Sequence, residues 1–207
     1  MSKGIFITLE GGEACGKSTL AENLKTRYAG ENVVFVREPG GTVASEKIRE
    51  VVLFTETELK TEVLLFAASR NELVSKVIKP SLEQGKIVIC DRFIHSSLAY
   101  QGHARGFGMD RVLDLNGLDI EPDLTIYLKI DPVEAFKRKT FDENDSFERQ
   151  KLRFHQRVAE GYDICAKKYK YFHTIDATKS IEAVLNEAID AIEKTMKEKA
   201  RKSLSPC

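Results

Sequence analysis

The sequence predicts a single α/β domain with a doubly wound, five-stranded parallel sheet flanked by helices. Two observations support this fold class: short apolar runs rich in β-branched residues, and longer amphipathic segments that alternate with them. The run at 87–90 is apolar at every position, as expected for a strand whose two faces are both covered. The predicted strands span residues 4–9, 32–36, 86–90, 124–129 and 172–175.

Apolar residues at three- and four-residue spacing predict the helices between these strands. The expected helices span residues 18–29, 62–83, 132–140, 147–168 and 181–199. Strands that alternate with helices form βαβ units, and their right-handed crossovers leave helices on both faces of the sheet. Ligands of such folds bind beyond the carboxyl ends of the strands, so we expect the functional site there.

The composition of the 207-residue chain limits its partners and its location. Lys plus Arg equals Asp plus Glu, at 32 each, so no broad positive field exists to hold nucleic acid or an acidic membrane surface. The first twelve residues hold too few apolar side chains for a secretory leader or a membrane span, which favours a cytoplasmic protein. We expect one domain over residues 1–196 and a disordered tail over 197–207, where basic and small polar residues mix.

The four cysteines are predicted to be reduced thiols. Cys15, Cys90, Cys165 and Cys207 are widely spaced and form no C-x-x-C pair. This spacing argues against a zinc site and against a disulfide framework.

A phosphate-binding loop follows the first predicted strand. The stretch matches G-x-x-x-x-G-K-[ST] and opens a helical pattern. Its glycines let backbone N–H groups and the helix N-terminus approach phosphate oxygens closely. The residues expected to bind ATP here are Gly11, Gly12, Glu13, Ala14, Cys15, Gly16, Lys17, Ser18 and Thr19.

Three side chains of this region are expected to act on the triphosphate and its metal. Lys17 is predicted to bridge the β- and γ-phosphates, and Ser18 to offer its hydroxyl to Mg²⁺. The apolar run at 87–90 ends in Asp91, which we expect to be the second metal partner, although an Asp at this position can equally cap a helix.

Four arginines near predicted strand ends indicate what accepts the phosphoryl group. A phosphate-binding loop alone serves switches, motors and kinases. Phosphoryl transfer between two anionic substrates needs cations on the acceptor side, and guanidinium groups suit phosphate. Arg37, Arg49, Arg70 and Arg92 therefore favour an acceptor that carries its own phosphate.

A series of motifs resembles bacterial thymidylate kinase, a family of P-loop nucleoside monophosphate kinases. The motifs are REPGGT at 37–42, LLFAASR at 64–70, DRF at 91–93, SSLAYQG at 96–102, PDLTIYL at 122–128 and IDAT at 175–178. They cover the chain from residue 4 to about residue 191. The resemblance implies transfer of the γ-phosphate of ATP to dTMP, giving dTDP and ADP in dTTP synthesis, by a homodimer.

The resemblance also implies roles for individual residues. Phe66 would stack on thymine and Arg70 would donate to its carbonyl, while Ser97 and Gln101 would read the remaining polar edge. In its apolar run, Phe66 also fits a core position. Tyr100 and Glu13 would favour deoxyribose, Arg49 and Arg92 would clamp the acceptor phosphate, and Arg37 would order this side of the site. The turn formed by Glu38, Pro39 and two glycines would pass close to the acceptor, and Asp176 would lie beside adenine.

The predicted lid, at about 138–150, departs from the family. The family pattern D-R-[IFL]-[DE] appears here as 145–148, DSFE, so that serine replaces the usual arginine. We expect Arg149, and next Arg138, to supply the missing cation. Both residues lie close to the altered position along the chain.

Three other functions remain open from the sequence. A deoxynucleoside kinase or another P-loop small-molecule kinase would need an acid to deprotonate a hydroxyl acceptor. A GTP-binding switch would need an N-K-x-D motif, which the sequence lacks. A binding module that has lost catalysis is the third, because the lid is altered. His95 and His103 have no role in the predicted reaction.

Overall fold

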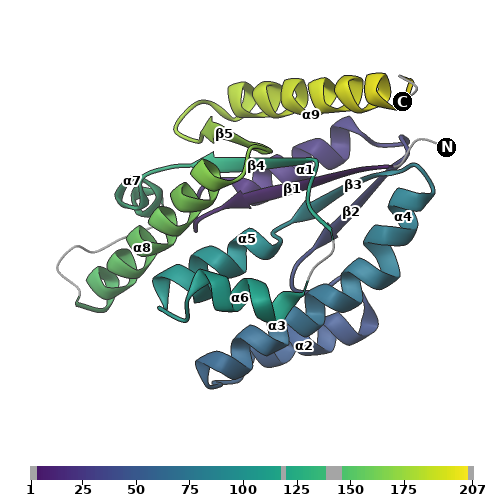
Figure 1. Ribbon diagram of the computed structural model, residues 1–207. Coiled ribbons are helices and arrows are strands. Elements are labelled where there is room, and N and C mark those ends of the chain that lie inside the picture. The colour runs from purple at the N-terminus through teal and green to yellow at the C-terminus, as the bar shows by residue number, and fades with distance from the viewer. Residues whose placement is uncertain (1–3, 118–119, 139–145, 205–207) are drawn as a thin grey trace.

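The computed structural model describes residues 4–117, 120–138 and 146–204. Five parallel strands form one sheet in the order β2-β3-β1-β4-β5 (Figure 1). This topology confirms the predicted fold class. The strands are β1 (Ile5–Gly11), β2 (Val33–Arg37), β3 (Ile87–Asp91), β4 (Leu124–Lys129) and β5 (Phe172–Asp176).

The register of the central strands brings their carboxyl ends together. Every residue of β1 is buried, and β1 pairs with β3 on one side and β4 on the other. Leu9 of β1 lies opposite Asp91, and Asp91 lies opposite Arg37 of β2. The last residues of β1, β2 and β3 therefore share one edge of the sheet, where ligands of parallel sheets bind.

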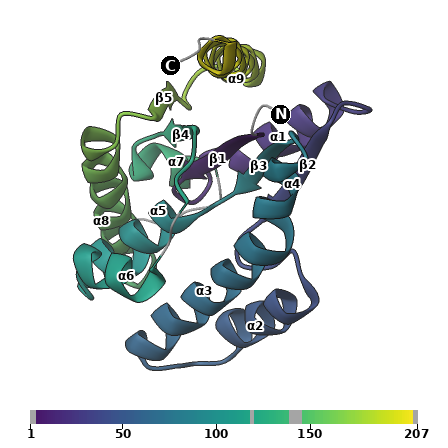
Figure 2. The same cartoon turned by 45° about the vertical axis from the view of Figure 1, so that its right-hand side comes forward.

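Helices cover both faces of the sheet. One face carries α1 and α9, and the other carries α3, α5, α6 and α8 (Figures 1 and 2). Two short π-helical segments, η1 and η2, continue α3 and α5. The helical elements are α1 (Lys17–Arg27), α2 (Val43–Phe54), α3 (Leu59–Leu73), η1 (Val74–Ile78), α4 (Lys79–Glu83), α5 (Ile94–Ser97), η2 (Leu98–Ala104), α6 (Met109–Asn116), α7 (Pro132–Lys137), α8 (Ser146–Lys168) and α9 (Ile181–Leu204).

The alternation of side chains along β1 explains how a single strand serves both faces. Ile7 and Leu9 pack with Leu24 of α1 and Ile192 of α9. Phe6 faces the other side, where it meets Phe93 edge-on with ring centroids 5.0 Å apart. Burial of apolar surface on both faces fixes the sheet as a rigid support for the edge that carries the site.

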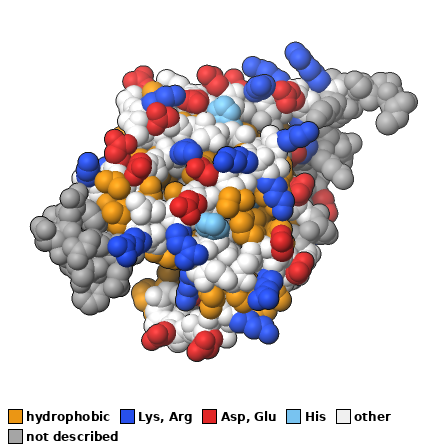
Figure 3. Space-filling model, turned by 60° about the vertical axis from the view of Figure 1, so that its left-hand side comes forward, with side chains coloured by type: hydrophobic (Ala, Val, Ile, Leu, Met, Phe, Trp, Pro, Cys, Tyr) orange, Lys and Arg blue, Asp and Glu red, His pale blue; other side chains and the backbone are white. Residues whose placement is uncertain are grey.

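Helix α9 corrects one expectation about the chain's end. It runs to Leu204, so residues 197–204 are helical rather than part of a disordered tail. The apolar period that predicted a helix to residue 199 in fact continues for one more turn. None of the helices in the described part of the chain combines the length and the apolar character that a membrane crossing needs. On the face shown in Figure 3, basic and acidic side chains are interspersed.

Candidate active site

The phosphate-binding loop joins β1 to α1 as the sequence predicted. Gly16 precedes the first helical residue with φ 90°, a left-handed conformation that glycine adopts without strain. No side chain caps the N-terminus of α1. Its first backbone N–H groups are therefore available to an anion, and the helix dipole adds partial positive charge at the same point.

Lys17 and Asp91 meet at the edge of the sheet. The buried ammonium group of Lys17 donates to Oδ1 of Asp91, the last residue of β3. Ser18 and Asp91 line one cavity of about 360 Å³. A hydroxyl and a carboxylate are oxygen ligands of the kind that Mg²⁺ prefers, directly or through water. The described residues contain no group of three or more His, Cys, Asp or Glu that could hold a metal alone.

A second cavity, of about 430 Å³, extends from the phosphate-binding loop toward the β5–α9 connection. Ala14, Cys15, Gly16 and Thr19 line its loop side, and Ala177 and Lys179 line the opposite side. Arg138 also lines this cavity, and its Nη2 donates to the backbone oxygen of Ala177 at 2.7 Å. We refer to this space as the donor cavity.

Asp176 does not line the donor cavity. Its carboxylate accepts from the backbone N–H of Thr178 at 2.9 Å and from the Thr178 hydroxyl at 2.7 Å. These hydrogen bonds lower the pKa of Asp176. The structure therefore gives Asp176 a role in the turn between β5 and α9, and presents its neighbour Ala177 to the cavity.

A third cavity, of about 210 Å³, lies across the sheet edge from the donor cavity. We call it the acceptor cavity. The structure brings most of the predicted acceptor residues together on its wall. These are Glu38, Pro39, Arg49, Phe66, Arg70, Arg92, Ser97, Tyr100 and Gln101, joined by Leu53, Phe93 and Ser96, which the sequence analysis did not name.

Arg70 of α3 is held by a buried hydrogen-bond network. Its Nε donates to Glu38 Oε2 at 2.8 Å, Nη1 to Asn116 Oδ1 at 2.5 Å, and Nη2 to Ser97 Oγ at 2.9 Å. Burial raises the pKa of Glu38 to about 7, although the charge of Arg70 and its hydrogen bond act in the opposite direction. The guanidinium of Arg70 is thus fixed in orientation before any ligand binds.

Arg92 has an unusual backbone and a fixed side chain. Its φ of 70° is left-handed, which is uncommon for a residue other than glycine. Nη1 donates to the backbone oxygen of Gly11 at 3.3 Å, to Ser96 Oγ at 3.1 Å and to the Tyr162 hydroxyl at 3.3 Å. The guanidinium also lies against Tyr100, whose hydroxyl interacts with it. Nη1 therefore fixes the side chain on the protein, while the residue lines the acceptor cavity.

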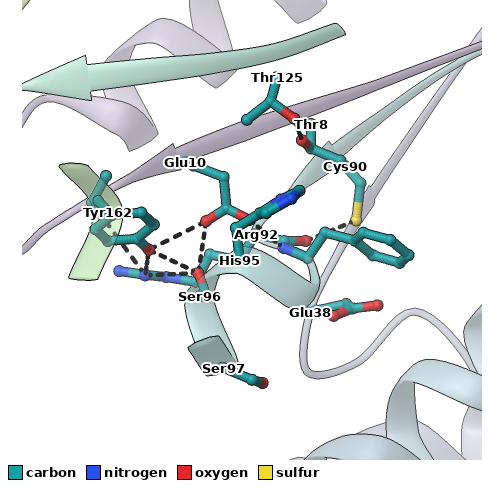
Figure 4. Close-up of polar contacts among 12 residues, drawn as sticks. Thr8, Glu10, Glu38, Cys90, Arg92, His95, Ser96, Ser97, Thr125 and Tyr162 are labelled. Atoms are coloured by element: carbon teal, nitrogen blue, oxygen red, sulfur yellow. Dashed lines mark hydrogen bonds and ion pairs between the residues drawn. The ribbon is translucent and has the colours of Figure 1, made fainter. Parts of the chain in front are cut away.

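Glu10 of β1 joins the same network through the hydroxyls of Ser96 and Tyr162 (Figure 4). The Ser96 and Tyr162 hydroxyls donate to Glu10 Oε2 at 2.7 and 3.1 Å, and each accepts from Arg92. The backbone N–H of Phe93 donates to Oε1 at 2.8 Å. Complete burial raises the pKa of Glu10, against the opposing influence of Ser96 and Arg92. Glu10, Ser96 and Tyr162 were not predicted as site residues from the sequence.

Two residues predicted for the acceptor side lie elsewhere. Arg37 forms an exposed ion pair with Glu46 at 2.9 Å and lines the cavity beside Ser18. Glu13 contacts His155 of α8, with Glu13 Oε2 and His155 Nε2 3.0 Å apart. Neither lines the acceptor cavity. Arg49, in contrast, lies on the cavity wall, where its Nη1 donates to the backbone oxygen of Pro39 at 2.8 Å.

The comparisons with known proteins agree on one family. The family model described as thymidylate kinase matches residues 9–188. A thymidylate kinase from Bacillus velezensis is 45% identical, over 94% of this chain and 97% of the relative. Another, from Thermoanaerobacter sp., is 42% identical over 93% and 98%. The chain belongs to the thymidylate kinase family. A crystal structure of thymidylate kinase from Ehrlichia chaffeensis matches with a TM-score of 0.72 and 36% identity, covering 92% of this chain and 99% of that one.

Part of the predicted thymidylate kinase lid lies outside the described residues. These are residues 139–145, together with the side chain of Arg149. Ser146 begins α8. Of the two cations expected in the lid, Arg138 is thus the one whose contacts are known. His95 is buried among aromatic rings, where burial and Arg70 lower its pKa to about 3, and it lines neither cavity.

Proposed function

We propose that this chain transfers the γ-phosphate of ATP to dTMP, giving dTDP and ADP. The observation that carries the proposal is the hydrogen bond from Arg92 to Gly11, the first residue of the phosphate-binding loop. The cation facing the acceptor cavity is thereby tied to the loop facing the donor cavity. Two phosphate-bearing substrates that fill these cavities would meet at this point.

The proposed reaction needs alignment and charge neutralisation rather than a general base. The phosphate oxygen of dTMP is already a nucleophile, so in-line positioning and electrostatic stabilisation supply most of the rate. Lys17 would leave Asp91 for the transferring phosphate, and Arg92, with Arg49, would bind the acceptor phosphate. Mg²⁺ bound with ATP would be held by the Ser18 hydroxyl and, through water, by Asp91, and it would neutralise developing charge.

The acceptor cavity suits a pyrimidine deoxynucleotide. Phe66 offers an aromatic face and Arg70 a donor for a ring carbonyl. Tyr100 lies against Arg92, 5.2 Å from guanidinium carbon to ring centroid, where it would leave no room for a ribose 2′-hydroxyl. The carboxylate of Glu13 contacts His155 in this structure, so it would have to leave His155 before it could reach the sugar 3′-hydroxyl.

Arg138 is our leading candidate for the lid cation, ahead of Arg149, which the sequence had favoured. It already lines the donor cavity, where it donates a hydrogen bond to the backbone oxygen of Ala177 in the β5–α9 turn. Arg138→Ala and Arg149→Ala should each be made. If both variants keep kcat within about twofold of the parent, neither residue supplies the missing lid charge.

A homodimer is the proposed assembly. Helices α2 and α3 lie side by side at one end of the molecule (Figure 2) and expose apolar side chains that a second copy could cover. Phe54 is 83% exposed, with Leu53 and Leu64 nearby on the same pair of helices. Light scattering of the purified protein measures the assembly directly. A cytoplasmic location is proposed as well, in keeping with the proposed use of ATP as the phosphoryl donor.

The function is tested by ADP release with dTMP, dUMP, dGMP, UMP and thymidine as acceptors. We expect dTMP to give the highest kcat/KM, and Lys17→Ala to remove the signal. Faster consumption of thymidine than of dTMP would instead identify a deoxynucleoside kinase. ADP release that does not depend on any acceptor would indicate a nucleotide switch.

A further inference from the structure

Gln101 lines the acceptor cavity, and Glu62 holds the nitrogen of its side-chain amide. Gln101 lies in the π-helical segment η2 and is almost fully buried. Its Nε2 donates to Oε1 of Glu62 at 2.8 Å. No described residue donates to its Oε1. One N–H of the amide is therefore bonded to Glu62, and Oε1 on the other side of the amide is left as an acceptor for a ligand.

The carboxylate of Glu62 can bond to the N–H groups of the Gln101 amide but not to its oxygen. It is on α3, the helix that also carries Phe66 and Arg70. Its second oxygen accepts from Nη1 of Arg105. A carboxylate paired with a guanidinium accepts hydrogen bonds and has none to donate. As long as this pair is intact, the carbonyl oxygen of Gln101 cannot turn toward Glu62.

Arg70 and Gln101 together offer an asymmetric pair of hydrogen-bonding groups. A guanidinium only donates, so Arg70 matches a carbonyl oxygen. Gln101 Oε1 on the same wall matches an N–H donor. Thymine and uracil carry O4 next to N3–H and fit this pair. Cytosine carries an amino group next to a bare ring nitrogen, so it would place donor against donor and acceptor against acceptor.

We propose that Glu62, held by Arg105, is a specificity-determining residue that fixes the amide of Gln101 and thereby excludes cytosine nucleotides. The proposal rests on the proposed pyrimidine acceptor and adds the device that selects the base. Neither Glu62 nor Arg105 lines the acceptor cavity. Glu62 and Arg105 are positioning residues, and their effect passes through Gln101.

The test is Glu62→Gln, with kcat/KM measured for dTMP, dUMP and dCMP. A glutamine at position 62 can donate as well as accept, so the amide of Gln101 is free to turn. We expect the preference for dTMP over dCMP to fall about tenfold. A site that hydrogen-bonds the edge of a base rejects a base that leaves its buried donors and acceptors unpaired, and a Gln101 amide that can turn would relieve part of that mismatch. The preference for dTMP over dUMP should stay within about twofold, because in the proposed binding mode Gln101 would face N3–H and not the 5-methyl group. Where dCMP turnover is slow, its inhibition constant against dTMP gives the same ratio.

Two further variants separate this role from simple tethering of α3 to η2. Glu58→Gln removes the same charge from an exposed site on the boundary of α3, and should leave both ratios unchanged. Arg105→Gln releases Glu62 and should shift the dCMP ratio in the same direction, by about threefold. It also provides the test should Glu62→Gln fail to fold.

An unchanged dTMP-to-dCMP ratio in Glu62→Gln would overturn the proposal. So would an equal fall for all three nucleotides, because that pattern means a loosened cavity. A parent protein that does not phosphorylate dTMP would instead overturn the proposed function, so the two failures are distinguishable.

Discussion

The donor loop and the acceptor cavity both face phosphate, yet they are assembled from different parts of the chain. The loop is contiguous and consists mainly of backbone N–H groups, with Lys17 as its one cation. The acceptor cavity takes side chains from the β2–α2 turn, α2, α3, η2 and the residues after β3. Two of its arginines are tied to buried acids, Arg70 directly to Glu38, and Arg92 to Glu10 through the hydroxyls of Ser96 and Tyr162.

The difference predicts how each region responds to substitution. A site built on backbone groups depends on a few residues and tolerates changes in its surroundings. A site built on buried charged side chains fails when any partner is removed, because the remaining charge is left without compensation. Substitutions in the acceptor cavity should therefore change the KM for dTMP and leave the KM for ATP nearly unchanged. Substitutions in the donor loop should leave the binding of dTMP nearly unchanged.

Lys17→Ala should have the largest effect. Its ammonium is the one side-chain cation of the loop, and it stabilises charge on the transferring phosphate. We expect kcat to fall roughly 1,000-fold, while the Kd for dTMP, measured by calorimetry, stays within about threefold. A comparable loss of dTMP binding would show that the two regions are not separate.

Arg92→Lys should come next and act on the other substrate. Lysine keeps the charge but cannot hold Gly11, Ser96 and Tyr162 with one edge while it binds phosphate with another. We expect kcat/KM for dTMP to fall about 100-fold and KM for ATP to change less than twofold. Equal effects on both substrates would contradict the division between donor and acceptor regions.

Glu38 should make the stability of the acceptor region depend on pH. Its pKa is about 7 in the folded chain against an ordinary value of 4.5. Between these values the folded chain binds the extra proton, so the free energy of unfolding falls as pH rises from 4.5 to 7, by an amount on the order of 3 kcal/mol. Below pH 4.5 the stabilisation is fully present, and above pH 7 it is lost.

Glu38→Gln should remove this component of the pH dependence. The measurement is urea unfolding of the ligand-free protein at pH 5 and pH 8, with the parent compared against the variant. Burial also raises the pKa of Glu10, but that contribution is common to parent and variant and cancels when their pH-dependent differences in the free energy of unfolding are subtracted. An identical difference between the two pH values in parent and variant would mean that Glu38 is ionised throughout.

The same contrast explains what the sequence could predict. The parallel sheet and the phosphate-binding loop were predictable because each depends on residues that are close in the chain. The shift from α3 to η1 was not, since π-helical and α-helical turns bury similar apolar patterns. Nor could the sequence show that Arg37 pairs with Glu46 rather than facing the acceptor cavity. Glu10 left one signal, as the one charged residue of the buried strand β1.

Tyr162 left no signal at all, because its partners Ser96, Arg92 and Glu10 are 66, 70 and 152 residues away along the chain. Only the packing of α8 on η2 and β4 brings its hydroxyl to Arg92 and Glu10. In an α8 sequence rich in aromatic and charged residues, nothing separates it from a core tyrosine. Its ring is also a core group, stacked on Tyr127 with centroids 5.2 Å apart.

Tyr162→Phe should have the smallest effect of the series. It separates the contribution of the Tyr162 hydrogen bonds from that of the packing of its ring. The ring stays, while Arg92 and Glu10 each lose one hydrogen bond. We expect KM for dTMP to rise about fivefold, in line with roughly 1 kcal/mol for one such bond, with KM for ATP unchanged. Tyr127→Phe is the matched control, because it removes a hydroxyl from the stacked partner, which contacts Asp163 at 3.4 Å. If both variants change KM for dTMP alike, the tyrosines act through packing, and the ordering of Arg92 has another source.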